Sequence, residues 1–333
     1  MNTKKALTAV AAGLGAASLA LAAMLPAAQA DPTGAPEYRD LAGVGSDTTQ
    51  DVMNVIANAV TKNGTKILGS YDALPPDGST TISTKAAADC QNIPRPNGSS
   101  AGRDALVASL QAGDGCLQFA RSSSSRGTKT NAVPLAYIPF ALDGVAFAVN
   151  SDGDVPKEMT KAELEAIYKC QNTSVVPVLP QSGSGTRGYW LGRFGITETQ
   201  ITDGTYPCLL PKADGGTGVP YTQEHNGLSL KKNEVQPYSI AVWQAQATAQ
   251  RADVRGKTVL GVLDGVAPTV INNSYGYTRK VYNLIPVSKA DDATSLEHEA
   301  FVGPNSLVCQ QSAGINIQGF GVIADCGNDT DRG

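Results

Sequence analysis

Short apolar runs alternate with amphipathic stretches along most of this sequence, and the alternation limits the folds open to it. Residues 40–44 and 117–120 read as short buried strands. Apolar side chains at helical spacing follow residue 49 and residue 102. Strands that alternate with helices favour an α/β fold with mostly parallel sheets. A length of 333 residues fits two such lobes better than a single sheet.

Further elements are predicted along the chain. Strands are expected within residues 133–150, 175–179, 239–247 and 282–287, with a turn or crossover at Asp143-Gly144. Helices are expected near residues 187–194 and over 295–302. Another helix should begin after Thr160, because Thr160 and Glu163 have capping-box spacing.

The first thirty residues have the pattern of a secretory signal peptide. Lys4 and Lys5 precede an apolar, uncharged run over residues 6–25, and Ala28-Gln29-Ala30 is a small-residue cleavage site. Cleavage after Ala30 would give a secreted, extracellular protein, or a periplasmic one if the host has an outer membrane. A membrane anchor is the alternative, because the apolar run is nearly long enough to span a bilayer. Asp31 stands where a lipoprotein would have cysteine, so no lipid anchor is expected.

Composition and motifs argue against several functions. The chain has 26 basic and 30 acidic residues and no basic run, whereas nucleic-acid binding needs clustered Lys and Arg. No serine lies in a G-x-S-x-G elbow, and neither His225 nor His298 belongs to a zinc motif. Both histidines are expected at the surface. We therefore expect no enzyme activity, catalytic residue, metal or organic cofactor, with a secreted hydrolase as the alternative.

All six cysteines follow the proposed cleavage site. An even number in an exported chain indicates disulfides, and no C-x-x-C motif favours the rival metal site. Six cysteines allow many pairings, but their spacing falls into three sequential pairs. The predicted disulfides are Cys90–Cys116, Cys170–Cys208 and Cys309–Cys326.

Polar turns recur where helices are expected to begin. They cover residues 46–49, 99–102 and 182–186. The N-terminus of a helix carries unpaired N–H groups and about half a positive charge, so it binds anions without net protein charge. Ser and Thr hydroxyls add donors, and glycine lets an oxyanion approach the backbone. Ordinary helix capping is the alternative, because Ser, Thr and Asp are preferred at these positions anyway.

Six segments occur in a fixed order along the chain: GVGSDTT (43–49), NGSSAG (97–102), LQFARSS (117–123), PFALDGVAFAVN (139–150), TKAELEAIY (160–168) and QSGSGTRGYW (181–190). Taken together, they resemble the phosphate-binding proteins of bacterial phosphate ABC transporters. This is the PstS-like branch of the type II periplasmic binding proteins. The resemblance implies two α/β lobes, each a mostly parallel sheet flanked by helices, with a two-stranded hinge and a ligand cleft between them.

The resemblance also implies where the chain passes between the lobes. Crossovers are expected near residues 142–150 and 254–266. Lobe I would then comprise residues 31–142 and 266–333, and lobe II residues 143–265.

Ligand contacts are implied from each polar turn. Ser99 matches the ligand serine of the family's GSS turn, and Ser184, Gly185 and Thr186 match its anion loop. The expected ligand-binding residues are Ser46, Asp47, Thr48, Ser99, Ser100, Arg121, Ser122, Ser123, Ser184, Gly185 and Thr186.

The sequence departs from the family at charged positions. Ser123 stands where members place an Asp that accepts the proton of hydrogen phosphate. Pro180 and Ser182 stand where members place Arg and Asp. Asp47 is the candidate for the missing acceptor, and Arg121, Arg103 and Arg187 are the candidates for the missing cation, since Arg suits forked pairing with oxyanions.

The implied function is that of an exported, monomeric solute-binding protein for ABC-type uptake or scavenging. Its implied partners are inorganic phosphate, or a similar oxyanion, and an ABC transporter permease. The alternative is a secreted module of the same fold that serves another ligand, a protein or the cell wall, without phosphate transport.

Overall fold

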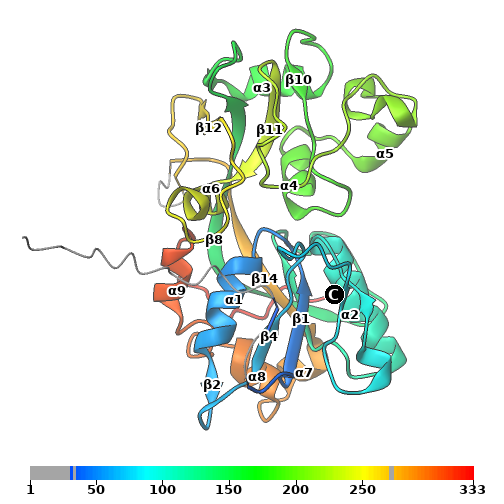
Figure 1. Ribbon diagram of the computed structural model, residues 1–333, viewed down its shortest axis with the longest axis vertical. Coiled ribbons are helices and arrows are strands. Elements are labelled where there is room, and N and C mark those ends of the chain that lie inside the picture. Colours follow the sequence, from blue (N-terminus) through cyan, green and yellow to red (C-terminus); the bar gives the residue numbers. More distant parts are fainter. Residues whose placement is uncertain (1–30, 33–34, 270–273) are drawn as a thin grey trace, which may run out of the picture.

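The computed structural model describes residues 31–32, 35–269 and 274–333, and the proposed signal peptide lies outside these residues. Figure 1 shows two lobes, one above the other, joined by the long strands β8 (Leu135–Asn150) and β14 (Thr278–Pro286). Across the described ranges, no helix combines the length and the apolar character needed to cross a membrane.

One sheet passes through both lobes, because β8 belongs to both. Residues 135–144 of β8 pair with β14 in lobe I. Residues 145–150 pair with β11 and β12 in lobe II. The strand order is β10-β11-β8-β14-β7-β1-β4, with β12 also on β8. The remaining strands of this sheet are β1 (Leu41–Gly45), β4 (Leu68–Ser70), β7 (Phe119–Ser122), β10 (Val176–Pro177), β11 (Glu234–Ser239) and β12 (Thr258–Leu260).

Most strands within each lobe point the same way. In lobe I, β1 runs parallel to β4 and β7, and β14 lies antiparallel between β7 and β8. In lobe II, β10 and β11 are parallel, and β8 runs antiparallel to β11 and β12. The helices cover these sheets, as Figure 1 shows. The predicted two-lobe α/β fold is therefore confirmed.

The helices are distributed between the lobes as follows. Lobe I contains α1 (Gln50–Ala59), α2 (Ser99–Ala112), α7 (Val287–Asp291), α8 (Leu296–Phe301) and α9 (Ser312–Ile317). Lobe II contains α3 (Lys161–Tyr168), α4 (Gly185–Arg193), α5 (Glu198–Thr202) and α6 (Ile240–Ala247). The small outer strands are β2 (Thr61–Lys62), β3 (Thr65–Lys66), β5 (Thr81–Ile82), β6 (Ile93–Pro94), β9 (Glu158–Met159) and β13 (Val262–Leu263).

Aromatic side chains fill the core of each lobe. In lobe I, the rings of Phe119 and Phe301 lie 5.0 Å apart and join β7 to α8. In lobe II, Trp190 contacts Tyr168 and Phe194 at 5.8 and 5.3 Å between ring centroids. These contacts fix the base of α4, whose first turn reaches the space between the lobes.

Two local predictions need correction. Asp143 and Gly144 form no turn, because both lie inside the continuous strand β8. The alternative prediction, a crossover, agrees with the structure, since β8 passes at this point from its pairing with β14 to its pairing with β11. Glycine fits there because a Cβ would lie 2.6 Å from Ile240 Cδ1. Residues 240–247 form helix α6 instead of continuing a strand, and the Ser239 hydroxyl accepts the N–H of Val242 at 3.1 Å to begin it. Most of α6 is buried, so its apolar run lacks the one-sided pattern that identifies a surface helix.

The chain returns to lobe I later than expected. Residues 254–266 hold β12 and β13, which pair with β8 and β9 in lobe II. Beyond them, Val145 donates its N–H to Tyr277 O at 2.9 Å, immediately before β14 begins at Thr278. The two-stranded connection between the lobes is thus made by β8 and β14 themselves.

The described residues contain the three predicted disulfides, Cys90–Cys116, Cys170–Cys208 and Cys309–Cys326. The first lies in lobe I beside the end of α2, and the second ties the end of α3 to the loop before β11. The third holds the C-terminal segment of the chain. No described cysteine is free.

Candidate functional site

The end of β1 and the start of α2 approach each other very closely. A Cβ on Gly102 would lie 2.3 Å from Gly45 Cα and 3.0 Å from Val44 O. Gly45 also has a φ of 126°, a conformation that favours glycine. The glycines of the two polar turns therefore bring the turn after β1 next to the first turn of α2.

The two lobes touch directly at this place. Ser100, in the first turn of α2, donates its N–H to Gly183 O of lobe II at 3.2 Å. Asn97 Nδ2 donates to Gln223 Oε1 at 3.0 Å, and Gln181 Nε2 donates to Asn97 Oδ1 at 3.2 Å. The structure is therefore a closed form of the two lobes.

The polar turns from both lobes meet at the contact. The hydroxyls of Thr48 and Thr186 lie 3.3 Å apart, and those of Ser99 and Ser123 are also 3.3 Å apart. Ser123 donates its N–H to Ser99 Oγ at 3.0 Å. A Cβ on Gly185 would lie 2.4 Å from Ser99 Oγ and 2.3 Å from Ser123 Oγ, so the start of α4 lies against both serines. Five residues expected to bind the ligand, from segments far apart in the sequence, thus form one buried cluster.

Other residues expected at the ligand lie beside or beneath this cluster. Ser46 is buried, and its hydroxyl has no partner among the described residues. Ser122 donates its hydroxyl to Ser124 O at 2.7 Å. Ser184 caps α4 by accepting the N–H of Arg187 at 3.1 Å, and its hydroxyl donates to Glu224 Oε2.

The expected cations are engaged elsewhere. Arg121 lies under β1, where its guanidinium donates to Ser70 Oγ at 2.9 Å and Gly43 O at 3.3 Å, and burial lowers its pKa to about 10. Arg187 pairs with Glu198, and Arg103 pairs with Asp104, each at 2.7 Å.

Two other arginines reach the cluster. Arg279, on β14, donates to Thr186 Oγ1 at 2.8 Å and pairs with Asp143 Oδ2 at 2.9 Å. Arg251, in lobe II, pairs with Asp47 and Asp51 of lobe I at 3.3 and 3.0 Å. Neither arginine belongs to a motif, so the sequence offered no signal for them beyond residue type.

Glu224 and His225 also lie in the cluster. His225 Nε2 is 2.9 Å from Thr48 Oγ1. The expectation that His225 is a surface residue is wrong, because it is 1% exposed. Tyr238 Oη and Gln246 Nε2 both donate to the His225 carbonyl, at 2.5 and 2.9 Å, and hold this loop inside lobe II.

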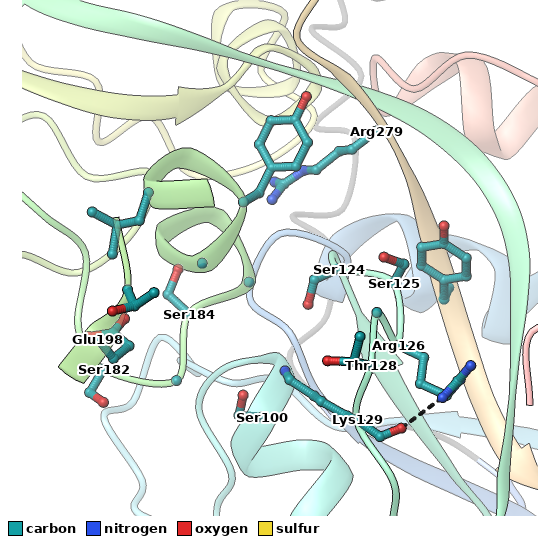
Figure 2. A pocket seen from close by; sticks show the side chains of 18 of the residues that line it. Ser100, Ser124, Ser125, Arg126, Thr128, Lys129, Ser182, Ser184, Glu198 and Arg279 are labelled. Atoms are coloured by element: carbon teal, nitrogen blue, oxygen red, sulfur yellow. Dashed lines mark hydrogen bonds between the residues drawn. The ribbon is translucent and has the colours of Figure 1, made fainter. Parts of the chain in front are cut away.

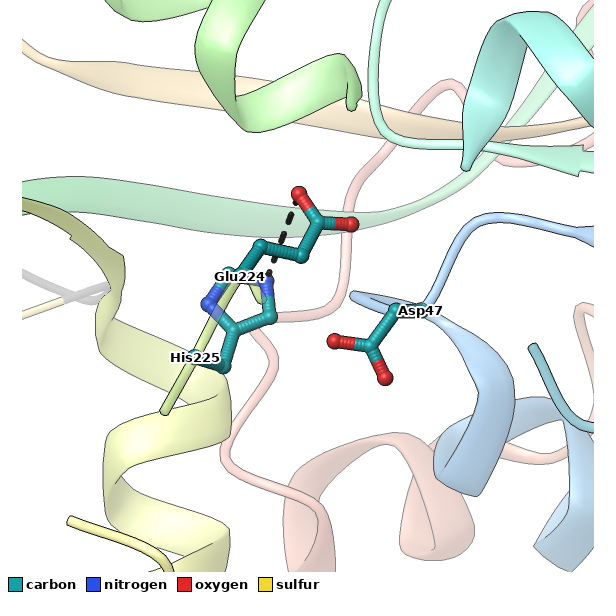
Figure 3. Close-up of side chains that lie close together, drawn as sticks. All are labelled: Asp47, Glu224 and His225. Carbon is teal, nitrogen blue, oxygen red and sulfur yellow. Dashed lines mark ion pairs between the residues drawn. The ribbon is translucent and has the colours of Figure 1, made fainter. Parts of the chain in front are cut away.

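Two carboxylates face each other across the lobes. Figure 3 shows Asp47 of lobe I opposite Glu224 and His225 of lobe II. Asp47 Oδ2 and Glu224 Oε1 are buried and have no hydrogen-bond partner among the described residues. Burial raises the pKa of Glu224 to about 7, and the nearby Asp47 carboxylate adds to the rise. Burial also raises the pKa of Asp47, against the opposing effect of Arg251.

The tautomer of His225 decides what this cluster can do. Potential ligand atoms of Asp47, Glu224 and His225 all lie within 4.8 Å of one another, a separation that a metal ion could bridge. However, His225 Nδ1 accepts the N–H of Ser239 at 3.3 Å. Burial lowers the pKa of His225 well below its ordinary value, so the ring is neutral and Nε2 carries its proton. Nε2 is thus a donor to Thr48, unsuited to ligate a metal or to act as a base.

Comparisons with known proteins agree with this architecture. A family model described as PBP superfamily domain (PBP_like_2) matches residues 30–294. A provisionally named phosphate ABC transporter substrate-binding protein from Clostridium perfringens, solved with bound phosphate, superposes with a TM-score of 0.53 at 16% identity, over 85% of this chain and 99% of that chain. An ABC-type phosphate transport receptor from Vibrio cholerae superposes with a TM-score of 0.51 at 18% identity, over 85% of this chain and 100% of that chain. At 16% and 18% identity, the similarity to these two structures establishes a shared fold.

The comparison with curated protein sequences found no match to the chain.

Proposed function

The chain belongs to the PBP superfamily, and from this premise we propose that it is an exported solute-binding protein that binds a small oxyanion between its lobes, with phosphate as the first candidate. Its proposed role is ABC-type uptake or scavenging. The proposed contacts are those of the turns at Thr48, Ser99, Ser123 and Ser184–Thr186, with Ser46, Asp47, Ser100 and Ser122 beside them. Arg121, whose guanidinium donates to Ser70 and Gly43, supports these turns instead of contacting the anion.

The observation that carries the proposal is the meeting of polar turns from both lobes. The helices α2 and α4 begin on opposite sides of the contact, at Ser99 and Gly185. Their N-termini supply partial positive charge and the first-turn N–H groups other than those of Ser100 and Arg187, which already donate to Gly183 O and Ser184 Oγ. The neighbouring hydroxyls supply neutral donors. The ring of His225 donates its one N–H to Thr48 Oγ1 and so leaves the Thr48 hydroxyl free to donate to an anion. Opening and reclosing of the lobes would let an anion enter between these donors.

The carboxylates suit an oxyanion that carries a proton. Asp47 Oδ2 and Glu224 Oε1 are acceptors without partners among the described residues, and a fully ionised anion would be repelled by them. Hydrogen phosphate can donate to such an acceptor, whereas sulfate has no proton to donate at neutral pH. Either residue could therefore replace the acceptor that Ser123 cannot provide. A ligand without a proton would leave this buried acceptor unpaired, which would weaken its binding by about 1–3 kcal/mol.

Titration calorimetry tests the proposal. The purified protein is refolded to remove any bound ligand and titrated with phosphate and then sulfate between pH 5 and 8. Binding of phosphate with rejection of sulfate is the expected result. Binding of both would indicate a general oxyanion site without proton selection.

A secreted module serving another ligand or a protein is the second candidate. The close approach of Gly185 to Ser99 and Ser123 favours it, because the two lobes already pack against each other at the proposed site. Absence of heat with either anion would support this candidate and contradict the first, and a pull-down against cell envelope would follow.

A further inference from the structure

A cavity of about 920 Å³ lies between the lobes, next to the start of α4. Figure 2 shows its walls. One wall is the first turn of α2 with residues 124–129, the opposite wall is residues 182–185 with Tyr189, and residues of β14 complete the lining. Pockets that hold organic ligands measure roughly 300–1,000 Å³. Inorganic phosphate has only five non-hydrogen atoms, so it would fill a small part of this space.

One buried donor points to an anion in the cavity. The Arg279 side chain is 3% exposed, is held by Asp143 and Thr186, and lines the cavity. Its Nη1 has no hydrogen-bond partner among the described residues. Figure 2 shows the guanidinium beside the first turn of α4. This helix is nine residues long, and its N-terminal N–H groups lie at the same end of the cavity.

Most charged side chains of the cavity wall are already paired, and Lys129 is the cation that could balance a bound anion. Arg126 and Lys280 pair with Asp331 and Asp325, which lie outside the cavity wall. Glu198 is neutralised by Arg187. Lys129 makes no ion pair with any residue that the structure describes, and Figure 2 shows it on the side of residues 124–129.

The remaining wall residues suit the organic part of a ligand, here called its body, if that part carries hydroxyl groups. Ser100, Ser124, Ser125 and Thr128 line it with hydroxyls that can both donate and accept hydrogen bonds. Tyr189 and Tyr282 add partly buried aromatic rings. A sugar presents the same mixture of hydroxyl groups and C–H faces.

We infer that the solute is an organic phosphomonoester with a sugar-sized, hydroxylated body. Its phosphoryl group lies at the N-terminus of α4 beside Arg279 Nη1, and its body lies in the cavity along residues 124–129. This inference rests on the proposed function, because it places a phosphoryl anion at the same contact between the lobes. As the monoanion, a phosphomonoester still carries a proton that the Asp47 or Glu224 carboxylate can accept. The inference adds the organic part of the ligand, which the cavity would hold.

The first test compares three ligands by titration calorimetry on the same refolded protein: glucose 6-phosphate, inorganic phosphate and glucose. Glucose 6-phosphate should bind at least ~10-fold more tightly than phosphate, and glucose alone should not bind measurably. Equal affinities for glucose 6-phosphate and phosphate would overturn the inference and leave the proposed function standing. Failure of all three ligands to bind would contradict both.

The second test fills the cavity. Ser125 is exposed and lines the cavity, so Ser125→Trp should fold while it occupies the space for the body. Thr173→Trp is the matched control, because Thr173 is exposed on a loop of lobe II that does not line the cavity. Ser125→Trp should lower the ratio of glucose 6-phosphate to phosphate affinity at least ~10-fold, and Thr173→Trp should leave it unchanged.

A second variant removes the positive charge of Lys129, which lies on the side of the cavity that would hold the body and attracts the anion over a longer distance. Lys129→Gln should weaken glucose 6-phosphate binding severalfold, by less in high salt than in low salt, since it removes a charge at an exposed position. If neither Ser125→Trp nor Lys129→Gln changes the binding of glucose 6-phosphate, the ligand does not lie in this cavity and the inference is overturned.

Discussion

Asp72 is a buried carboxylate outside the cluster of polar turns between the lobes, and its effect on stability can be isolated. It is 3% exposed in lobe I, and Asn54 Nδ2 donates to its Oδ1 at 2.6 Å. Burial raises the pKa of Asp72 to about 7, an effect that the Asn54 hydrogen bond only partly offsets. The folded state therefore holds a proton that the unfolded state releases between about pH 4 and 7.

Asp72→Asn should raise the free energy of unfolding at pH 8 by about 1–3 kcal/mol, because the folded state no longer keeps an ionised carboxylate buried. In the wild type, the contribution of Asp72 is most favourable at low pH and is lost as the pH rises through 7. The difference between variant and wild type should thus shrink towards pH 4. Urea unfolding at pH 4.5, 6 and 8 measures it, with Asp89→Asn, at an exposed residue, as the control. A difference that does not vary with pH would contradict the assignment.

Thr186→Val tests the proposed ligand contacts at a single hydroxyl group. The substitution keeps the shape of the side chain but removes the hydroxyl next to Thr48 and Arg279. Phosphate affinity should fall about 10-fold, which corresponds to about 1.4 kcal/mol for one hydrogen bond. Ser99→Ala should have a similar effect, and both proteins should melt cooperatively like the wild type. Unchanged phosphate affinity in both variants would exclude this cluster as the binding site.

The sequence predicts part of this cluster well and misses the rest. Thr48, Ser99 and Thr186 are found because a polar turn at a helix start has a local signature. Arg251, Arg279 and Glu224 have no such signature, since each reaches the cluster through long-range packing. His225 is missed for a related reason: its loop is polar, and only the contacts of Tyr238 and Gln246 bury it.

At the scale of the elements, one glycine in α2 and one in α4 have very different surroundings. Gly102 in α2 faces the backbone of Gly45 and Val44, so a methyl group would force the helix away from β1. Gly192 in α4 is exposed, and a Cβ there would meet nothing within 4 Å. Gly102→Ala should destabilise the protein by about 2–4 kcal/mol through displacement of packed backbone.

Gly192→Ala is the matched control and should stabilise the protein by about 0.5–1 kcal/mol, because alanine is the better helix former. Chemical denaturation of both variants measures the contrast. Equal effects of the two substitutions would show that α2 does not depend on its close approach to β1.

The disulfides should stabilise the folded protein by different amounts, according to the length of the loop that each one closes. Cys170–Cys208 spans 38 residues and Cys309–Cys326 spans 17. In the chain-entropy model these loops stabilise the fold by about 4 and 3 kcal/mol. Replacing Cys170 and Cys208 by Ala should therefore lower the melting temperature more than replacing Cys309 and Cys326. The reverse order, measured by calorimetry, would contradict this expectation.

Prediction of the elements succeeds where local rules apply. The capping box of Thr160 and Glu163 begins α3 as expected, and apolar spacing identifies α1 and α2. The rules fail for α6 and for the middle of β8, because both are buried nearly all round and lack a polar face. Burial on every side erases the periodicity that distinguishes helix, strand and turn.

At the scale of the whole molecule, Arg251 forms ion pairs that connect the two lobes. It belongs to lobe II, its side chain is 11% exposed, and it pairs with Asp47 and Asp51 of lobe I. Burial alone would lower its pKa, but the Asp51 and Asp47 carboxylates raise the pKa of Arg251 above its ordinary value. The guanidinium therefore remains charged in the closed form.

Arg251→Met should favour the open form, because closing the lobes would then bury two carboxylates without a cation. Small-angle scattering of the ligand-free variant should give a larger radius of gyration than the wild type. Arg255→Met, which removes a partly exposed arginine paired within lobe II, is the control. An unchanged radius for Arg251→Met would show that other contacts keep the lobes closed.

The place of β14 in the sheet has a consequence for the order in which the chain can fold. β14 lies between β7 and β8, although it follows them by more than a hundred residues. A growing chain that has completed lobe II still lacks the strand that joins β7 to β8. Until residue 286 is available, both strands present open edges that can pair with other chains. Lobe I is thus the first lobe to begin and the last to be completed, and a chaperone that binds exposed strands would have its longest opportunity there.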